Sequence, residues 1–344
     1  MRPRASRCTR STPRTDAAWT RSAARAPLPD QPHERTTVMT TITWIGLGHM
    51  GAPMSANLVS AGHEVRGFDL SEAAMATARE GGVQTFDTVH EALEGAEVVI
   101  TMLPKGEHSR AVYLGKDGVL ALAPKDALLI DSSTIDVATA EDLHRAAHDA
   151  DFAFVDAPVS GGISGAAAGT LTFMIGGEEE PARRAAEVAA PMAGRLVHTG
   201  AAGTGQAAKI VNNMMLFICL EACSEGSVLA DRLGLDPKVF WEIASVSSSN
   251  SWALQTWYPV PGMTESAAAN NNFDATFSAA LATKDIGLAL AAGEQTGVNL
   301  PAAELVAQRF QQLVADGLAD KDCSLIAKYA APDGTIPGWD PEKD

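Results

Sequence analysis

The 344-residue chain contains only four cysteines, Cys8, Cys219, Cys223 and Cys323, and no Cys-x-x-Cys pair. So few cysteines provide neither a disulfide framework nor a zinc site, and they fit a reducing cytoplasm. Cys219 and Cys223 lie one helical turn apart in an apolar segment, where we expect them to be small core residues. No metal site is predicted.

Three further features are missing. No uninterrupted run of 18 or more apolar residues suggests a membrane span, and no internal repeat of solenoid period is present. An excess of positive charge is also missing: the net charge is −16. This charge argues against nucleic acid or an anionic membrane surface as a partner.

Positive charge is concentrated at the N-terminus. Residues 1–39 carry eight Arg and three acids, a net charge of +5, so the remainder of the chain carries −21. The segment is rich in Arg, Ser, Thr, Ala and Pro, as an organelle transit peptide is. We favour a disordered extension, or upstream sequence ahead of a true start at Met39, because Met39 leads directly into the first predicted strand.

The length of the chain predicts two domains. Hydrophobic content of 46% and charged content of 20% are ordinary for globular proteins and allow a sizeable core. We expect an α/β fold with an N-terminal Rossmann-type doubly wound parallel sheet over 40–202. A long helix then joins it to an all-α C-terminal domain over 203–335, and 336–344 form a tail.

A glycine-rich turn near the start predicts a dinucleotide site. An apolar strand over 42–45 leads into Gly46-Leu-Gly48-His49-Met50-Gly51, a helix over 52–61 and a second strand over 63–68. In this motif the glycines allow a tight turn and close approach of the backbone to a pyrophosphate, and the helix N-terminus offers N–H groups to the phosphates. A plain turn is the alternative, but the flanking strands and the acid that follows argue against it.

That acid, Asp69, closes the second strand 18 residues after Gly51. A carboxylate there accepts hydrogen bonds from the ribose hydroxyls and repels a 2′-phosphate, which predicts NAD rather than NADP. No Arg follows it in Leu70-Ser71-Glu72. Its alternative role is to cap the helix predicted over 71–80.

Strands and helices continue to alternate as far as residue 198, which predicts a parallel sheet with helices on both faces and ligands at the carboxyl ends of the strands. The predicted strands cover 97–101, 127–131, 151–155, 171–175 and 196–198, and the helices cover 88–94, 107–114, 136–149 and 179–190. After the strand at 151–155, Ser160-Gly161-Gly162 offers a hydroxyl and backbone N–H groups, a nest suited to a carboxylate. An ordinary loop is the alternative.

The segment Gly203-Thr-Gly-Gln-Ala-Ala-Lys209-Ile-Val-Asn212-Asn213 opens a nearly all-round apolar stretch. It predicts a buried helix of about 28 residues, or ~42 Å, ending near residue 233. Lys209 and Asn213 are four residues apart and share a face. Because a buried ammonium is costly unless it is paired or used, Lys209 is either a lysine that extends its amine to solvent or a catalytic one.

Beyond this helix the pattern is almost wholly helical. Helices are predicted over 238–244, 252–257, 277–296 and 301–317, with a short element over 322–330. Lys284 lies among Leu281, Ile286 and Leu288, which indicates a partly buried helix and makes it a candidate anion contact. An exposed helix ion pair is the alternative.

Four sequence blocks together resemble the β-hydroxyacid dehydrogenase family over 41–330. They are the glycine turn, Asp156-Ala-Pro-Val-Ser160-Gly161-Gly162, the segment from Gly203 to Asn213, and Lys284-Asp285. The first is generic to dinucleotide enzymes, whereas the other three in this order are highly specific. Tyr258-Pro-Val-Pro-Gly262, behind Trp252, is similar to the members that act on hydroxyisobutyrate.

The resemblance implies a role for each matching residue. Lys209 would be the catalytic acid/base, with Asn213 orienting the substrate and Ser160, Gly161 and Gly162 holding its carboxylate. The cofactor, NAD, would contact Gly46, Gly48, His49, Met50, Gly51, Asp69, Leu103, Pro104, Thr134 and Lys284. His108 departs from the family pattern, since relatives often place Asn there near the nicotinamide ribose, but it retains a hydrogen-bond donor.

The activity that the resemblance implies is oxidation of (S)-3-hydroxyisobutyrate to methylmalonate semialdehyde, a step in valine breakdown, by a homodimer or homotetramer. Lys209 would take the hydroxyl proton as hydride moves to the nicotinamide. One alternative is a tartronate-semialdehyde or succinate-semialdehyde reductase of the same family. More distant alternatives are an imine reductase, which usually lacks the lysine, and a non-catalytic nucleotide-binding protein.

Overall fold

The computed structural model of the protein describes residues 39–343. Of the extension predicted over 1–39, only Met39 is among them, and the other expectations for that segment lie outside the described residues. All the described residues belong to one compact unit.

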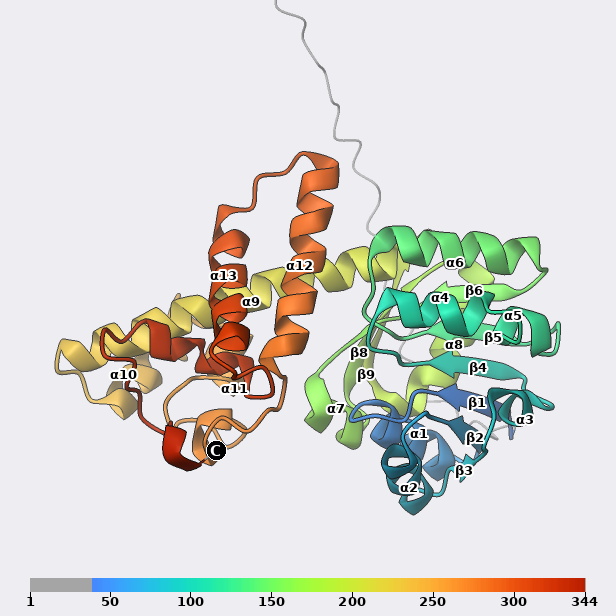
Figure 1. Ribbon diagram of the computed structural model, residues 1–344, viewed down its shortest axis with the longest axis horizontal. Coiled ribbons are helices and arrows are strands. Elements are labelled where there is room, and N and C mark those ends of the chain that lie inside the picture. The colour runs from blue at the N-terminus through green and yellow to red at the C-terminus, as the bar shows by residue number, and fades with distance from the viewer. Residues whose placement is uncertain (1–38, 344) are drawn as a thin grey trace, which may run out of the picture. The chain divides into compact units, whose positions relative to one another are not determined.

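Within residues 39–343, a nine-stranded sheet occupies the N-terminal half of the protein (Figure 1). Its strands are β1 (Thr41–Ile45), β2 (Glu64–Phe68), β3 (Gln84–Thr85), β4 (Val98–Thr101), β5 (Leu128–Asp131), β6 (Ala153–Asp156), β7 (Val159–Ser160), β8 (Leu171–Gly176) and β9 (Ala193–Gly200). The order is β3-β2-β1-β4-β5-β6-β8-β7, with β9 paired to β8. The first six strands are parallel and follow the 3-2-1-4-5-6 order of a Rossmann-type sheet, which confirms the predicted fold class.

The last three strands correct the expectation of a wholly parallel sheet. β8 runs antiparallel to β6 and β7, and β9 runs parallel to β8. A helix that the sequence analysis missed, α7 (Gly162–Ala168), lies between β7 and β8. Its first turn has no side-chain cap, and its Gly- and Ala-rich sequence has no apolar period. No local sequence pattern therefore predicts this helix.

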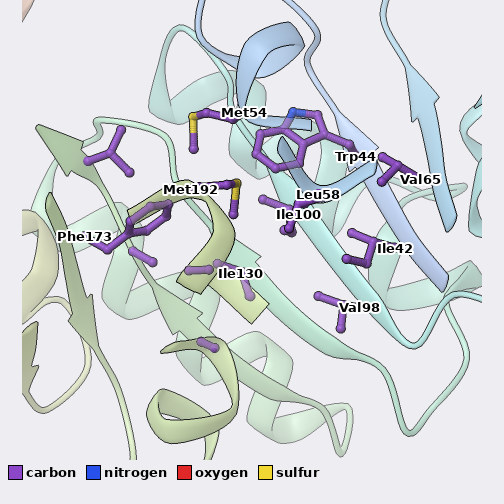
Figure 2. Packing of buried hydrophobic residues seen from close by; sticks show 14 of the residues in the cluster. Ile42, Trp44, Met54, Leu58, Val65, Val98, Ile100, Ile130, Phe173 and Met192 are labelled. Atoms are coloured by element: carbon purple, nitrogen blue, oxygen red, sulfur yellow. The ribbon is translucent and has the colours of Figure 1, made fainter. Parts of the chain in front are cut away.

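Side chains of the strands alternate between two hydrophobic layers, one on each face of the sheet. Ile42 and Trp44 of β1 lie in the first layer and Ile45 in the second. Figure 2 shows the first layer, where Trp44 packs with Met54 and Leu58 from α1. The helices of the first layer are α1 (Gly51–Ser60), α2 (Glu72–Glu80) and α8 (Glu179–Ala189); those of the second are α3 (Val89–Leu93), α4 (Gly106–Leu114), α5 (Val119–Leu122) and α6 (Val137–Asp149).

This arrangement brings three loops together. The strand order reverses between β1 and β4, and parallel sheets bind ligands at the carboxyl ends of the strands beside such a reversal. The glycine turn follows β1, residues 102–104 follow β4, and residues 132–135 follow β5. The loops predicted to contact a cofactor therefore lie side by side at the carboxyl ends of β1, β4 and β5.

The long helix α9 (Thr204–Arg232) has 29 residues and closely matches the predicted one. It packs against β8, β9 and α6, and then against the helices that follow, so it runs from the sheet into the helical part of the chain (Figure 1). The remaining helices are α10 (Pro237–Ala244), α11 (Trp252–Thr256), α12 (Ala279–Thr296) and α13 (Pro301–Ala315), with 3₁₀ helices η1 (Ala190–Met192), η2 (Ala268–Asn271), η3 (Cys323–Tyr329) and η4 (Pro341–Lys343).

An aromatic cluster forms the core of the helical part. Phe217 of α9 meets Phe310 of α13 edge-on at 5.1 Å between ring centroids and stacks with Phe277 at 6.1 Å. Trp257 stacks on the same Phe277 at 6.1 Å. Ile336 is buried against this core, so part of the segment predicted as a tail is packed.

Among the described residues, α9 is the one helix long and apolar enough, by length and composition, to cross a membrane. The core helix of a soluble protein can have the same length and composition. In α9, Lys209, Asn213 and Glu221 are buried polar residues.

Candidate active site

The turn after β1 has the shape of a phosphate cradle. Gly46 has φ +97°, and a Cβ there would lie 2.3 Å from the Met102 carbonyl oxygen. A Cβ on Gly51 would lie 2.0 Å from the Gly46 carbonyl oxygen, so α1 and β1 touch backbone to backbone. A Cβ on Gly48 would meet nothing within 4 Å. The turn is therefore closed on the protein side and open at Gly48, as close approach of a pyrophosphate requires.

Asp69 is bonded to this turn and is not the cap of α2. Its Oδ2 accepts from the Leu47 N–H at 2.7 Å, and its Oδ1 accepts from the Ser71 N–H at 2.8 Å. The cap of α2 is Ser71, whose hydroxyl accepts from the Ala74 N–H. The carboxylate is half-buried beside the glycine turn, which fits binding of a ribose and leaves the capping alternative without support.

The other predicted cofactor contacts have varied surroundings. His49 is exposed, whereas Met50 is partly buried against the first hydrophobic layer. Leu103 donates its N–H to the Ser133 hydroxyl at 2.8 Å, which ties the loop after β4 to the loop after β5. Pro104 and His108 are exposed, and the His108 imidazole lies 3.9 Å from Glu107.

The start of α9 is fixed by a buried carboxylate. Asp156, at the end of β6, accepts from the Gly203 N–H and the Gln206 N–H, both at 2.9 Å. His144 of α6 lies 2.8 Å from the same carboxylate. A carboxylate at a helix N-terminus accepts from the free N–H groups there and interacts favourably with the positive end of the helix dipole. Asp156 therefore sets where the first turn of α9 meets the sheet.

Lys209 lies in the second turn of α9 with only 9% of its surface exposed. No carboxylate of residues 39–343 lies within ion-pair distance of its amine. Burial is the main cause that lowers the pKa of Lys209 from 10.5 to about 8; nearby Lys284 lowers it further and Asp285 opposes both. A lysine with this pKa can exchange a proton near neutral pH.

Three side chains and one carbonyl form a polar cluster near this lysine. Asn213 donates from Nδ2 to Asp285 Oδ2 at 2.7 Å, and Asp285 Oδ1 lies 2.9 Å from Lys284 Nζ. Lys284 Nζ also donates to the Thr134 carbonyl oxygen at 2.7 Å. The cluster thus joins α9, α12 and the loop after β5.

Ser160, Gly161 and Gly162 are not bonded to that cluster in the described part of the chain. Ser160 ends β7 and pairs with Thr172 of β8. Gly161 and Gly162 both have positive φ, +140° and +68°, and a Cβ on Gly162 would meet open space. The turn therefore presents an open backbone face, as a nest for a carboxylate does.

Sequence analysis assigned no role to three residues of this region: Asp285, Asp156 and Gln206. All three lie in the sequence blocks that resemble the family, but no local pattern indicated their hydrogen-bond partners. Asn213 and Asp285 are 72 residues apart in the chain, so their bond exists only in the folded protein. Among the described residues, no group of three or more His, Cys, Asp or Glu side chains is arranged to hold a metal ion.

Two family models match the chain in succession. One, described as the NAD binding domain of 6-phosphogluconate dehydrogenase, matches 41–200. The other, described as NAD-binding of NADP-dependent 3-hydroxyisobutyrate dehydrogenase, matches 203–330.

Known proteins resemble the chain over most of its length. A Mycobacterium tuberculosis protein described as "Probable 3-hydroxyisobutyrate dehydrogenase" is 48% identical over 84% of this chain and 97% of its own. The NAD-dependent L-serine dehydrogenase of Pseudomonas aeruginosa is 39% identical over 86% and 99%. The solved structure of Mycobacterium tuberculosis 3-hydroxyisobutyrate dehydrogenase with L-serine is 47% identical, covers 86% of this chain and all of that one, and superposes with a TM-score of 0.79.

Proposed function

Because the chain belongs to the β-hydroxyacid dehydrogenase family, we propose that it oxidises (S)-3-hydroxyisobutyrate to methylmalonate semialdehyde with NAD. The observation that carries this proposal is the buried amine of Lys209, which has no ion-pair partner among residues 39–343 and whose pKa is lowered to about 8. The names of the similar proteins support the substrate, and the polar cluster around Lys209 supports acid–base chemistry.

NAD is the cofactor, and the residues of the first half fit it. The open Gly48 face suits a pyrophosphate, and the Asp69 carboxylate suits a ribose with free hydroxyls. When bound, NAD supplies the nicotinamide ring that receives hydride from the carbon bearing the substrate hydroxyl. We further propose that Asp69 disfavours NADP, although one matching family model is described as NADP-dependent.

Lys209 acts as the base in the oxidation. Its neutral amine takes the hydroxyl proton while hydride leaves the adjacent carbon, so the C–O bond becomes a carbonyl and Lys209 becomes an ammonium. In the reverse reaction the ammonium returns the proton to the developing alkoxide. Burial keeps the amine partly neutral near pH 8, and the Lys284 charge acts in the same direction.

Asn213 orients the hydroxyl. Its Nδ2 is engaged by Asp285, which fixes the side chain, and its Oδ1 accepts from Asn212 at 3.2 Å. The Nδ2 group carries two N–H bonds, so one remains to donate to the oxygen of the substrate hydroxyl while the hydroxyl proton goes to Lys209. The open turn Ser160-Gly161-Gly162 binds the substrate carboxylate. Binding there fixes the position of the reacting carbon relative to Lys209 and the nicotinamide.

L-Serine is a second candidate, because the names of two of the similar proteins include it. It differs from hydroxyisobutyrate only at C2, where an ammonium replaces a methyl group. Two lysines face the site, and Asp285 is already engaged by Asn213 and Lys284. We therefore expect the uncharged methyl group to be preferred. Tartronate and succinate semialdehydes remain the alternatives in the reductive direction.

Initial rates decide among these substrates. The panel is (S)-3-hydroxyisobutyrate and L-serine with NAD or NADP, and the two semialdehydes with NADH or NADPH. We expect the highest kcat/KM with hydroxyisobutyrate and NAD. A higher kcat/KM with L-serine, or with either semialdehyde, would replace the proposed substrate. Asp69→Ala should raise kcat/KM for NADP relative to NAD, and an unchanged ratio would contradict the role of Asp69.

Further proposals concern the whole protein. We propose a cytoplasmic enzyme of valine catabolism that forms a homodimer or homotetramer. We also propose a cofactor domain over 40–202 and a substrate and dimerisation domain over 203–335. The separate sheet and helical cores, and the meeting of the two family models near residue 202, support this division.

A further inference from the structure

Gln206 is a fully buried polar residue in the first turns of α9. Its Nε2 donates to the Ser133 carbonyl oxygen at 2.7 Å, and its Oε1 accepts from the Ile135 N–H at 3.0 Å. One carboxamide therefore spans Thr134, with a bond on each side of it. Buried polar groups are costly when unpaired, so this pairing fixes the side chain and the loop together.

The loop that Gln206 holds, residues 133–135, carries two links to the predicted cofactor site. The Ser133 hydroxyl accepts from the Leu103 N–H at 2.8 Å. The Thr134 carbonyl oxygen accepts from Lys284 Nζ at 2.7 Å. Leu103, Thr134 and Lys284 are among the residues proposed to contact the cofactor.

Gln206 also shares a helix face with the proton-transfer residues. Lys209 and Asn213 follow it at three and seven positions, which is the spacing of one α-helical face. Asn213 is bonded to Asp285, and Asp285 is paired with Lys284, which returns to Thr134. These contacts and the stretch of α9 that carries Lys209 form a closed circuit between the helix and the loop. Among the described residues, the Gln206 carboxamide makes the only hydrogen bonds between α9 and the loop.

We propose that Gln206 is a positioning residue that sets the distance between the loop at Thr134 and the amine of Lys209. This inference rests on the proposed function, since it concerns the alignment of proton and hydride transfer. In the described part of the chain, Gln206 makes no hydrogen bond to the glycine turn or to Asp69, so we expect its loss to affect alignment more than the binding of NAD. A misplacement of about 1 Å in such a site costs up to about 10²-fold in rate.

The variant Gln206→Met tests the proposal, because Met has similar length and makes neither hydrogen bond. We expect kcat for hydroxyisobutyrate to fall about 10- to 100-fold, with the Kd for NAD, measured by fluorescence titration, staying within about threefold. Hydrogen–deuterium exchange of the unliganded protein should show faster exchange of the Ile135 amide. This readout does not depend on turnover.

Thr204→Val is the matched control. The Thr204 hydroxyl bonds to Ala201 and Thr199 at the same end of α9, so this change loosens the helix end without touching the loop. We expect a lower Tm with kcat within about twofold of wild type. If Thr204→Val lowers kcat as much as Gln206→Met does, the effect is general loosening and the positioning role is wrong.

Gln206→Glu is a second variant that tests the positioning role if Gln206→Met does not fold. It keeps the acceptor for Ile135 and removes the donor to Ser133, so kcat should fall while the Ile135 amide stays protected. Wild-type kcat in either folded Gln206 variant overturns the positioning role alone. If the wild-type protein oxidises no hydroxy acid, the proposed function fails, and the exchange of Ile135 still shows whether Gln206 holds the loop.

Discussion

At the scale of single residues, the protein buries the Lys209 amine where none of the carboxylates that the structure describes is within ion-pair distance of it. Lys209 is nine-tenths buried, and the nearby carboxylate, Asp285, is shared by Asn213 and Lys284. Such an arrangement destabilises the charged form of the amine and so lowers its pKa. An amine with a lowered pKa is partly neutral near neutral pH, as the proposed base must be. Function and stability should therefore respond in opposite directions to substitution at this position.

Lys209→Met tests this opposition. We expect kcat to fall by 10²- to 10⁴-fold, the usual contribution of general acid–base catalysis. Because the pKa of Lys209 is lowered to about 8 in the folded protein, its ammonium destabilises the fold near pH 7. Removing it should stabilise the protein by up to about 3 kcal/mol, since one pKa unit corresponds to 1.36 kcal/mol. Steady-state kinetics and thermal unfolding measure the two effects, and Lys209→Met retaining more than a tenth of kcat would end the assignment.

The pKa of Lys209 also fixes the pH dependence of the reaction. Oxidation needs the neutral amine, so its kcat/KM should rise about tenfold per pH unit below 8 and level off above it. Reduction needs the ammonium, so its kcat/KM should fall above about pH 8. Rates in both directions between pH 6 and 10, with circular dichroism to confirm folding, check this. A flat oxidation profile from pH 6.5 to 9.5 would exclude Lys209 as the base.

At the scale of elements, the N-terminus of α9 is the junction of the molecule. Asp156 anchors its first turn to β6, and two glycines make room for that carboxylate. A Cβ on Gly176 would lie 2.5 Å from Asp156 Oδ1, and one on Gly205 would lie 2.7 Å from Asp156 Oδ2. Both glycines allow this close packing, and Gly205 does so within a helix that would otherwise favour Ala.

Two glycines of α9 give a matched pair of variants. A Cβ on Gly205 would lie 2.4 Å from the Met174 carbonyl oxygen, whereas one on Gly226 would meet nothing within 4 Å. Gly205→Ala should destabilise the protein by about 1–3 kcal/mol through overpacking. Gly226→Ala should stabilise it by about 0.5–1 kcal/mol through helix propensity. Thermal or urea unfolding of both variants measures the contrast, and equal effects would show that α9 is not tightly packed on the sheet.

At the scale of the whole molecule, the helical part leaves apolar side chains on its surface. Val239, Ile243 and Val246, on and just after α10, are 50%, 56% and 85% exposed. A group of exposed large apolar residues is typical of a protein–protein interface. This surface supports the proposed association of identical chains.

Association is measured by light scattering after size exclusion. We expect the mass of a dimer or tetramer, and Ile243→Glu should shift the population toward smaller species. Leu70→Glu is the control, since Leu70 is 95% exposed but stands on the sheet half of the protein, far along the chain from α10. A monomer at micromolar concentration would contradict the proposed oligomer.

The sequence alone determined the features that local chemistry imposes. The glycine turn, Asp69 at the end of β2, the longer strands and most helices, and the length of α9 all follow from short-range patterns, whereas the short elements β3, β7 and α5 were not predicted. The parallel direction of the first six strands follows as well, because each is joined to the next by a helical connection. The reversal at β8 and the helix α7 had no such signal.

Tertiary structure decided what surrounds Lys209. Burial of its amine, the bond from Asn213 to Asp285 and the hold of Gln206 on residues 133–135 join positions about 70 residues apart. A pKa depends on every charge and every layer of protein within a few ångströms, and no local pattern encodes that environment. The sequence therefore identified the lysine as a candidate, and the burial that lowers its pKa to about 8 exists only in the folded chain.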